Sequence, residues 1–199
     1  MGGKKEDDVN VSNLTLRKSN GYGVRGYYGA SIHLDNVSVE NSGNCGVWVH
    51  GSKRNTMKNC NVSHSKRSGL YVYDGLMTID GNATTIHHNG TGGWGHYGLL
   101  ATSSSSIHLV SPLTKEMIST NNHGGRNYCG TIQTITENYG KPFKVEDSSI
   151  GTNIFARWKI NGTFYPGNIT NINTDGTYDI KFTDGDERKN TPLNEMQYN

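Results

Sequence analysis

Short stretches in which apolar and polar residues alternate recur along the first part of the chain at a constant interval. A glycine followed by such a stretch appears every 23 residues, at Gly23, Gly46 and Gly69. The same interval separates three asparagines that each open another alternating stretch, namely Asn13, Asn36 and Asn59. Two features that share one period indicate an internal structural repeat.

Each repeat contains three alternating segments, such as Ile32 with Leu34, Val37 with Val39, and Val47 with Val49. Alternation with a period of two predicts strands, and polar turn residues separate them. If each repeat forms one coil, stacking the coils pairs every strand in parallel with its copy about 4.8 Å away. The apolar side chains then form inward columns, and an asparagine repeated at one corner forms a hydrogen-bonded ladder.

The pattern is less regular after the third coil. Asn82 keeps the 23-residue step, but Ile79 and Ile86 fall one place off the apolar columns, so the Asn82 match can be coincidental. Further glycine-led segments begin at Gly98 and Gly130, after steps of 29 and 32 residues. We therefore expect fourth and fifth coils that are lengthened by loops.

Residues 57–62 and 68–72 resemble the parallel β-helix repeats of the pectate-lyase-like superfamily. The resemblance covers about residues 9–136 and implies an all-β fold, in which residues 1–136 form a short right-handed parallel β-helix of about five coils. This superfamily includes lyases, hydrolases, epimerases and non-catalytic scaffolds. The resemblance therefore predicts architecture rather than activity.

The three cysteines fit the same coil geometry. Cys45 and Cys129 each precede a repeat glycine, which places them at equivalent corners about three coils apart. That separation is roughly 14 Å at the strand spacing, beyond the roughly 7 Å that a disulfide allows. Cys60 falls in the inward column of Val37, where a thiol behaves as a small apolar side chain. Three free thiols favour a reducing compartment.

Charge and hydropathy narrow the range of partners. The formal net charge is +2 and no basic run is longer than two residues, so nucleic-acid binding is not expected. No window approaches the roughly 18 apolar residues that a membrane-spanning helix needs, and the first ten residues do not resemble a signal peptide. We expect an intracellular protein that is soluble or peripheral in an assembly.

Outward positions of the first three coils carry aromatic and basic residues in two columns. One column contains Arg25, Trp48 and Tyr71, and the next contains Tyr27, His50 and Tyr73. Neighbours in a column should stack on successive coils as an exposed strip, which we call the aromatic platform. Such a strip suits sugar rings or a partner's side chains; alternatively, a loop or the second domain covers it.

Catalytic groups show no comparable arrangement. Histidines and aspartates occur along the predicted coils, but no carboxylate pair or histidine–acid set falls at matching positions on adjacent coils. His87 and His88 are adjacent in sequence, so they should not both face one side of a strand. We predict no catalytic residue, metal or cofactor.

A different pattern follows the repeat. Residues 137–149 are polar and are predicted to form a linker, and residues 150–199 contain alternating segments at 154–158, 163–169 and 176–182. Asn161-Gly162 and Asp175-Gly176 lie between these segments as hairpin-turn signals, and Asp184-Gly185 begins the next turn. This meander predicts a small SH3-like barrel.

The order and spacing of aromatic, glycine and acidic residues over about residues 150–196 resemble the Tudor family. Many Tudor domains bind methylated Lys or Arg in an aromatic cage with an acidic residue beside it. The resemblance implies cage walls at Trp158, Tyr165 and Phe182 and the acid at Asp184, whereas Asp186 stands where methyl-lysine readers often have an aromatic residue. Alternatively, these rings serve only the core of the barrel or an intramolecular contact.

These features favour a non-catalytic interaction or scaffold protein with a protein partner, and a methylated peptide or a carbohydrate as further ligands. One alternative is a lectin or a carbohydrate-active enzyme of the polysaccharide lyase or epimerase type on the β-helix face. Another is a structural subunit of a larger assembly. Residues 1–10 contain too few apolar side chains to cover the first coil, so we expect a partner or self-association to cover it.

Overall fold

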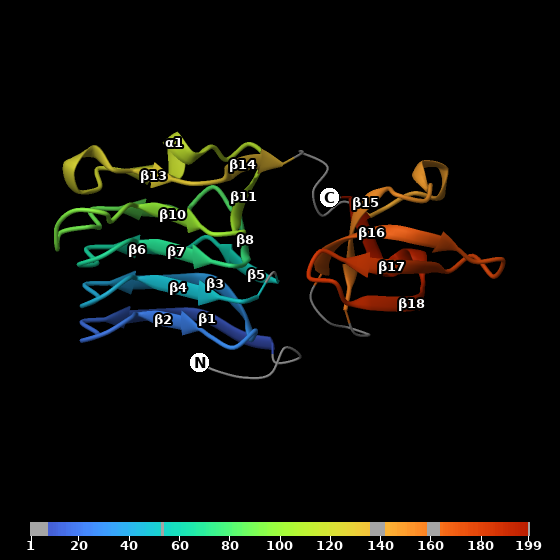
Figure 1. Cartoon of the computed structure of the whole chain (residues 1–199), viewed down its shortest axis with the longest axis horizontal. Coiled ribbons are helices and arrows are strands. Elements are labelled where there is room, and N and C mark those ends of the chain that lie inside the picture. Colours follow the sequence, from blue (N-terminus) through green and yellow to red (C-terminus); the bar gives the residue numbers. More distant parts are fainter. Residues whose placement is uncertain (1–7, 53, 136–141, 159–163, 199) are drawn as a thin grey trace. The chain divides into compact units, whose positions relative to one another are not determined.

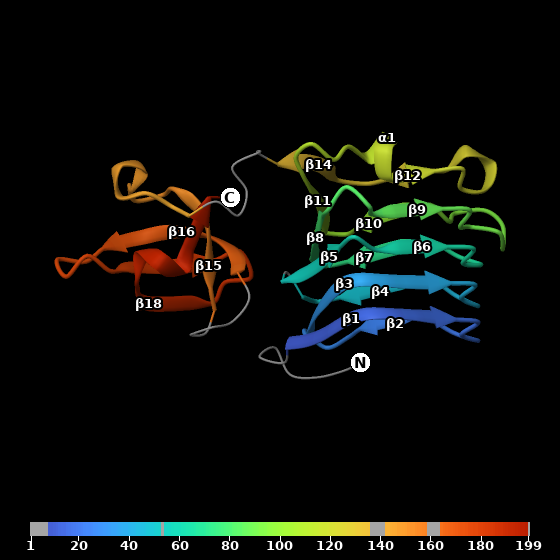
Figure 2. The same ribbon diagram turned by 180° about the vertical axis from the view of Figure 1, so that it is seen from behind.

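The computed structural model describes residues 8–52, 54–135, 142–158 and 164–198. The chain divides into two compact units, one ending at Thr134 and the other beginning at Ile135. Each unit is built from strands, with only short helical turns between them (Figures 1 and 2). The all-β fold class predicted from the sequence is confirmed.

The first unit is a β-solenoid whose strands lie in two parallel sheets. One sheet contains β2 (Val24–Gly26), β4 (Val47–His50), β7 (Leu70–Tyr73), β10 (Leu99–Thr102) and β13 (Tyr128–Cys129). The other contains β1 (Asp8–Arg17), β3 (Ser31–Glu40), β5 (Asn55–Lys58), β6 (Asn61–Ser63), β8 (Leu76–Asp80), β9 (Thr85–His87), β11 (Ser106–Val110), β12 (Ser119–Thr120) and β14 (Ile132–Ile135). The short helix α1 (Lys115–Ile118) lies between β11 and β12, and β14 adds the start of a sixth turn to the five that we expected.

The 23-residue step is confirmed for the first three coils. Val24 pairs with Val47, and Val47 pairs with Leu70, so the apolar residues form inward columns. Asn13, Asn36 and Asn59 occupy the same corner of successive coils and have positive φ angles of 54°, 52° and 50°. The Asn36 side-chain amide donates to Asn13 Oδ1 at 2.9 Å, which is the expected ladder. Asparagine suits this corner because it tolerates the left-handed region better than most residues.

The repeat glycines are required by the close approach of neighbouring coils. A Cβ on Gly23 would lie 2.2 Å from Val39 Cγ1 of the next coil, and one on Gly69 would lie 2.6 Å from Ile86 Cγ2. Real Cβ atoms do not approach other atoms so closely. The sequence period therefore records a steric constraint that each coil imposes on the next.

The fourth coil differs from the sequence prediction. Ile79 pairs with Met57 and Ile86 pairs with Val62, so both isoleucines lie in the apolar columns and the predicted offset is wrong. Lys58 pairs with Asp80, which places Gly81 opposite the Asn59 corner and leaves Asn82 out of register. The local steps of 22 and 24 residues compensate each other because burial of both isoleucines fixes the strand registers.

The fifth coil also corrects the prediction. Leu99 pairs with Tyr128, so Asn127 rather than Gly130 stands opposite Gly98. Cys129 consequently pairs with Leu100 and is exposed, and it is not equivalent to Cys45. All three cysteines are nevertheless free, as expected, and Cys60 is buried in the solenoid core.

The second unit is a five-stranded antiparallel sheet. Its strands are β15 (Asn153–Arg157), β16 (Phe164–Ile172), β17 (Tyr178–Phe182), β18 (Glu187–Thr191) and β19 (Met196–Tyr198), in the order β18-β17-β16-β15-β19. The three predicted segments form β15, β16 and β17, and the Asn161-Gly162 turn lies outside the described residues. Phe143 packs in the core of this unit and its amide donates to Met196 O, although we had placed it in the linker.

Candidate functional site

The barrel residues selected from the Tudor resemblance come from neighbouring strands. Trp158 directly follows β15, Tyr165 lies on β16, and Phe182 ends β17. Tyr165 pairs with Ala156, and Phe182 pairs with Gly167, so antiparallel pairing brings all three rings to one region. The Trp158 and Phe182 rings meet edge to face at 5.3 Å between centroids.

Burial separates these rings into two kinds. Tyr165 is 1% exposed and Phe182 is 2% exposed, and both belong to the apolar core of the barrel, whereas Trp158 is half-buried on its surface. A cage wall must present its face to the bound cation. In this conformation Tyr165 and Phe182 therefore act as core residues, as the alternative interpretation of the sequence held, and only Trp158 offers exposed ring surface.

The two acids lie in the turn that follows Phe182. Asp184 Oδ1 accepts from the Asp186 amide at 3.1 Å, and the Phe182 amide donates to Asp186 O at 2.8 Å. Both carboxylates are half-exposed. The turn thus holds two negative charges next to the edge of the Phe182 ring on which Trp158 packs.

The solenoid brings the two predicted columns of the aromatic platform together on adjacent strands. Arg25 pairs with Trp48, Trp48 with Tyr71, and His50 with Tyr73. The rings of Trp48 and His50 lie 5.7 Å apart, and those of His50 and Tyr73 lie 5.0 Å apart. The platform is therefore a continuous strip on β2, β4 and β7, at half-buried to exposed positions.

The columns are joined by ring stacking and by a cation. Tyr27 lies 5.8 Å from Trp48 in a stacked arrangement, and the Arg25 guanidinium lies 4.7 Å from the centre of the Trp48 ring. Tyr22 also stacks on Trp48, at 5.2 Å. Sequence reasoning missed Tyr22 because it lies before the repeat glycine Gly23, outside the alternating columns.

A cavity of about 170 Å³ lies beside the platform. It is lined by Tyr22 and Tyr71 together with Arg67 and His96. Burial lowers the pKa of His96, and the positive charges of Arg67 and Arg126 lower it further. The cavity therefore joins aromatic rings to a region of positive potential.

The only histidines that gather closely within the described residues lie on the other sheet. His87 Nδ1 and His88 Nδ1 are 2.7 Å apart, and the His64 and His88 rings are stacked at 5.2 Å. Our expectation that His87 and His88 diverge is wrong, because His88 takes a positive φ of 54° that turns its ring back. Burial, and then His88 and His64, lower the pKa of His87, while Glu40 opposes them. The described residues contain no group of three His, Cys, Asp or Glu side chains arranged to hold a metal ion.

The two units define a β-solenoid followed by a Tudor-like barrel, and comparison with protein families agrees. The family model described as right handed beta helix region matches residues 2–164, so the chain belongs to the right-handed β-helix family. The model of the Tudor domain of tumour suppressor p53-binding protein-1 matches residues 146–192. Comparisons with curated proteins and with solved structures gave no significant match. No helix in the described part of the chain is long and apolar enough to span a membrane.

Proposed function

We propose that this chain is a non-catalytic interaction protein in which the Tudor-like barrel recognises a partner and the β-solenoid is a rigid scaffold. The observation that carries the proposal is the pairing of a half-buried Trp158 with the acidic turn at Asp184 and Asp186. The match to a Tudor family model supports a binding role for this unit. The repeated backbone pairing of the solenoid supports a scaffold role, because each coil is held by its neighbours.

The ligand that suits the barrel is a methylated lysine or arginine on a protein partner. An alkylated cation is attracted to the face of an indole ring by about 0.5–2 kcal/mol, and Asp184 and Asp186 supply opposite charge. Tyr165 and Phe182 are buried, so a full cage requires their rings to be uncovered when the ligand binds. Such rearrangement lowers the apparent affinity, and we expect weak binding.

Titration of the full chain with peptides that differ only in lysine or arginine methylation tests this function. We expect methylated peptides to quench the Trp158 fluorescence and to bind at least tenfold more tightly than unmodified peptides. Trp158→Ala should abolish the difference, and Asp184→Asn should reduce it. Trp94→Ala removes a tryptophan that is 88% exposed on the solenoid and serves as the matched control. Equal binding of methylated and unmodified peptides would contradict the proposed ligand.

The aromatic platform favours a second candidate function, carbohydrate binding by the solenoid. Stacked rings at Tyr27, Trp48 and Tyr71 suit the apolar faces of sugar rings. Screening the chain and a Trp48→Ala variant against immobilised glycans tests this function. Glycan binding that Trp48→Ala removes and Trp158→Ala leaves unchanged would support a lectin-like solenoid. Absence of glycan binding in the wild type would exclude this candidate.

A further inference from the structure

One edge of the solenoid concentrates positive charge. The corners that connect the large sheet to the β2-β4-β7-β10-β13 sheet lie at residues 18–23, 41–46, 64–69, 88–98 and 121–127. These segments contain the basic residues Lys18, Lys66, Arg67 and Arg126 and the histidines His64, His88, His96 and His123, but no aspartate or glutamate. We call this edge the basic edge. The formal net charge of the whole chain is only +2, so the positive charge is gathered here.

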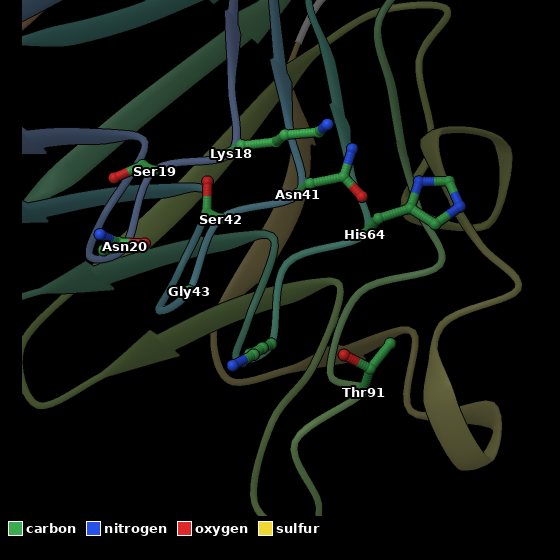
Figure 3. Close-up of a pocket in the computed structure, with 9 residues that line it drawn as sticks. Lys18, Ser19, Asn20, Asn41, Ser42, Gly43, His64 and Thr91 are labelled. Carbon is green, nitrogen blue, oxygen red and sulfur yellow. The ribbon is translucent and has the colours of Figure 1, made fainter.

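The basic edge contains a pocket of about 350 Å³. Figure 3 shows Lys18, Asn41 and His64 in line at one side of this pocket and Thr91 at another. Lys18, Asn41 and His64 each have a φ of 57°, and the Lys18 and Asn41 amides donate to Glu40 O and Ser63 O on the following coils. The regular coil stacking therefore sets three polar side chains of successive coils one above another.

The remaining lining supplies more hydrogen-bond donors. Lys66 enters from the third coil, and Ser19 and Asn20 enter from the first. Lysine, amide and hydroxyl groups all donate, and histidine donates in either protonation state. No carboxylate lines the pocket. The pocket is therefore complementary to a group that carries several acceptor oxygens.

The lysine charges at the pocket are not compensated by neighbours. Within the described residues neither Lys18 nor Lys66 takes part in an ion pair, and both are exposed. The nearest acid along the chain, Glu40, is paired with Arg17 at 2.9 Å. A bound anion would thus gain charge-assisted hydrogen bonds without first breaking a salt bridge.

We propose that this pocket binds a phosphate or sulfate group carried by a ligand of the solenoid. Donors reach the pocket from three coils and from more than one side, which matches the three or four oxygens of a tetrahedral oxyanion better than the two coplanar oxygens of a carboxylate. The site is distinct from the barrel and from the aromatic platform, and it adds an anion-binding function to the solenoid.

Titration of the full chain with inorganic phosphate, sulfate or acetate at constant ionic strength tests the proposal. We expect saturable changes in the amide resonances of Lys18, Asn41 and Lys66 with phosphate and sulfate, and at least tenfold weaker binding of acetate. Phosphate that binds more tightly than sulfate would identify a phosphate ester as the natural group, and the reverse order a sulfate ester. Shifts that rise linearly with concentration, or acetate that binds equally well, would overturn the proposal.

Matched variants locate the site. Lys18→Gln with Lys66→Gln should weaken phosphate binding at least tenfold, and each single variant should weaken it several-fold. Lys144→Gln with Lys181→Gln removes the same charge from the second unit, where both residues are exposed, and should leave binding unchanged. Equal losses in both double variants would mean that overall charge, rather than this pocket, attracts the anion. The single variants keep the comparison available if the Lys18 and Lys66 double variant does not fold.

Discussion

Replacing the repeat glycine Gly46 by alanine should destabilise the solenoid strongly. The new methyl group would lie 2.3 Å from Val62 Cγ1, 2.8 Å from Gly69 O and 2.9 Å from Ser65 Oγ. Gly69 O also accepts the Val47 amide at 2.8 Å, so the methyl group would push apart the atoms that hold two coils together. Overpacking a close-packed core costs about 1–3 kcal/mol. Because one contact is with backbone, we expect a loss near 3 kcal/mol in the free energy of unfolding.

The cysteines provide an assay that reports on the solenoid alone. Cys45 and Cys60 are buried in the solenoid and the barrel contains no cysteine, so pulsed thiol labelling along a urea gradient follows this unit. With a urea dependence of about 2 kcal/mol per molar, Gly46→Ala should lower the unfolding midpoint by roughly 1.5 M. Gly21→Ala is the control, because a Cβ there meets nothing within 4 Å. Equal midpoints for the two variants would refute the steric explanation of the repeat.

Three further predictions concern reactivity, pH and association. In the native protein, Cys129 should react rapidly with a thiol reagent and Cys60 only upon unfolding, because burial raises the pKa of the Cys60 thiol; rapid labelling of both would show that the core is open. Burial lowers the pKa of His108, so the stability of the solenoid should be complete above about pH 6.5 and fall below it in urea titrations, whereas a pH-independent midpoint would contradict this. Leu14 is 38% exposed on β1, which pairs only with β3 among the described strands, so the chain should self-associate in sedimentation runs and Leu14→Lys should weaken this; a monomer at every concentration, with slow amide exchange over residues 9–24, would show that the end is closed locally.

The first three coils could be predicted because one steric constraint repeats without insertion. Gly23, Gly46 and Gly69 each face the next coil at too short a distance for a side chain, so their spacing gives the register directly. In later coils the corners change length while the strands keep their inward residues. Leu99 has the same inward position as Leu70 after 29 residues, and a fixed period cannot locate such a strand. Counting from apolar columns rather than from glycines would have placed Ile79 and Ile86 correctly.

The two candidate surfaces differ in how far the sequence could describe them. The aromatic platform followed from the coil register, since parallel pairing places residues 25, 48 and 71 on adjacent strands. The cage was inferred from resemblance, which preserves positions but not exposure. Tyr165 and Phe182 are buried because the small barrel needs large side chains to fill its core, and burial of this kind depends on all five strands together.

The solenoid separates the residues that make it fold from those that can bind. Inward residues such as Val47 and Leu70 are fully buried and fix the coil, whereas Lys18 and Lys66 are exposed and take part in no ion pair among the described residues. Surface substitutions without such interactions usually change stability by less than about 0.5 kcal/mol. Replacing these lysines should therefore alter anion binding at unchanged stability, while replacing Gly46 should alter stability through contacts that never reach the surface. A surface that can vary at constant fold is what a scaffold requires, because its binding chemistry can change one rung at a time.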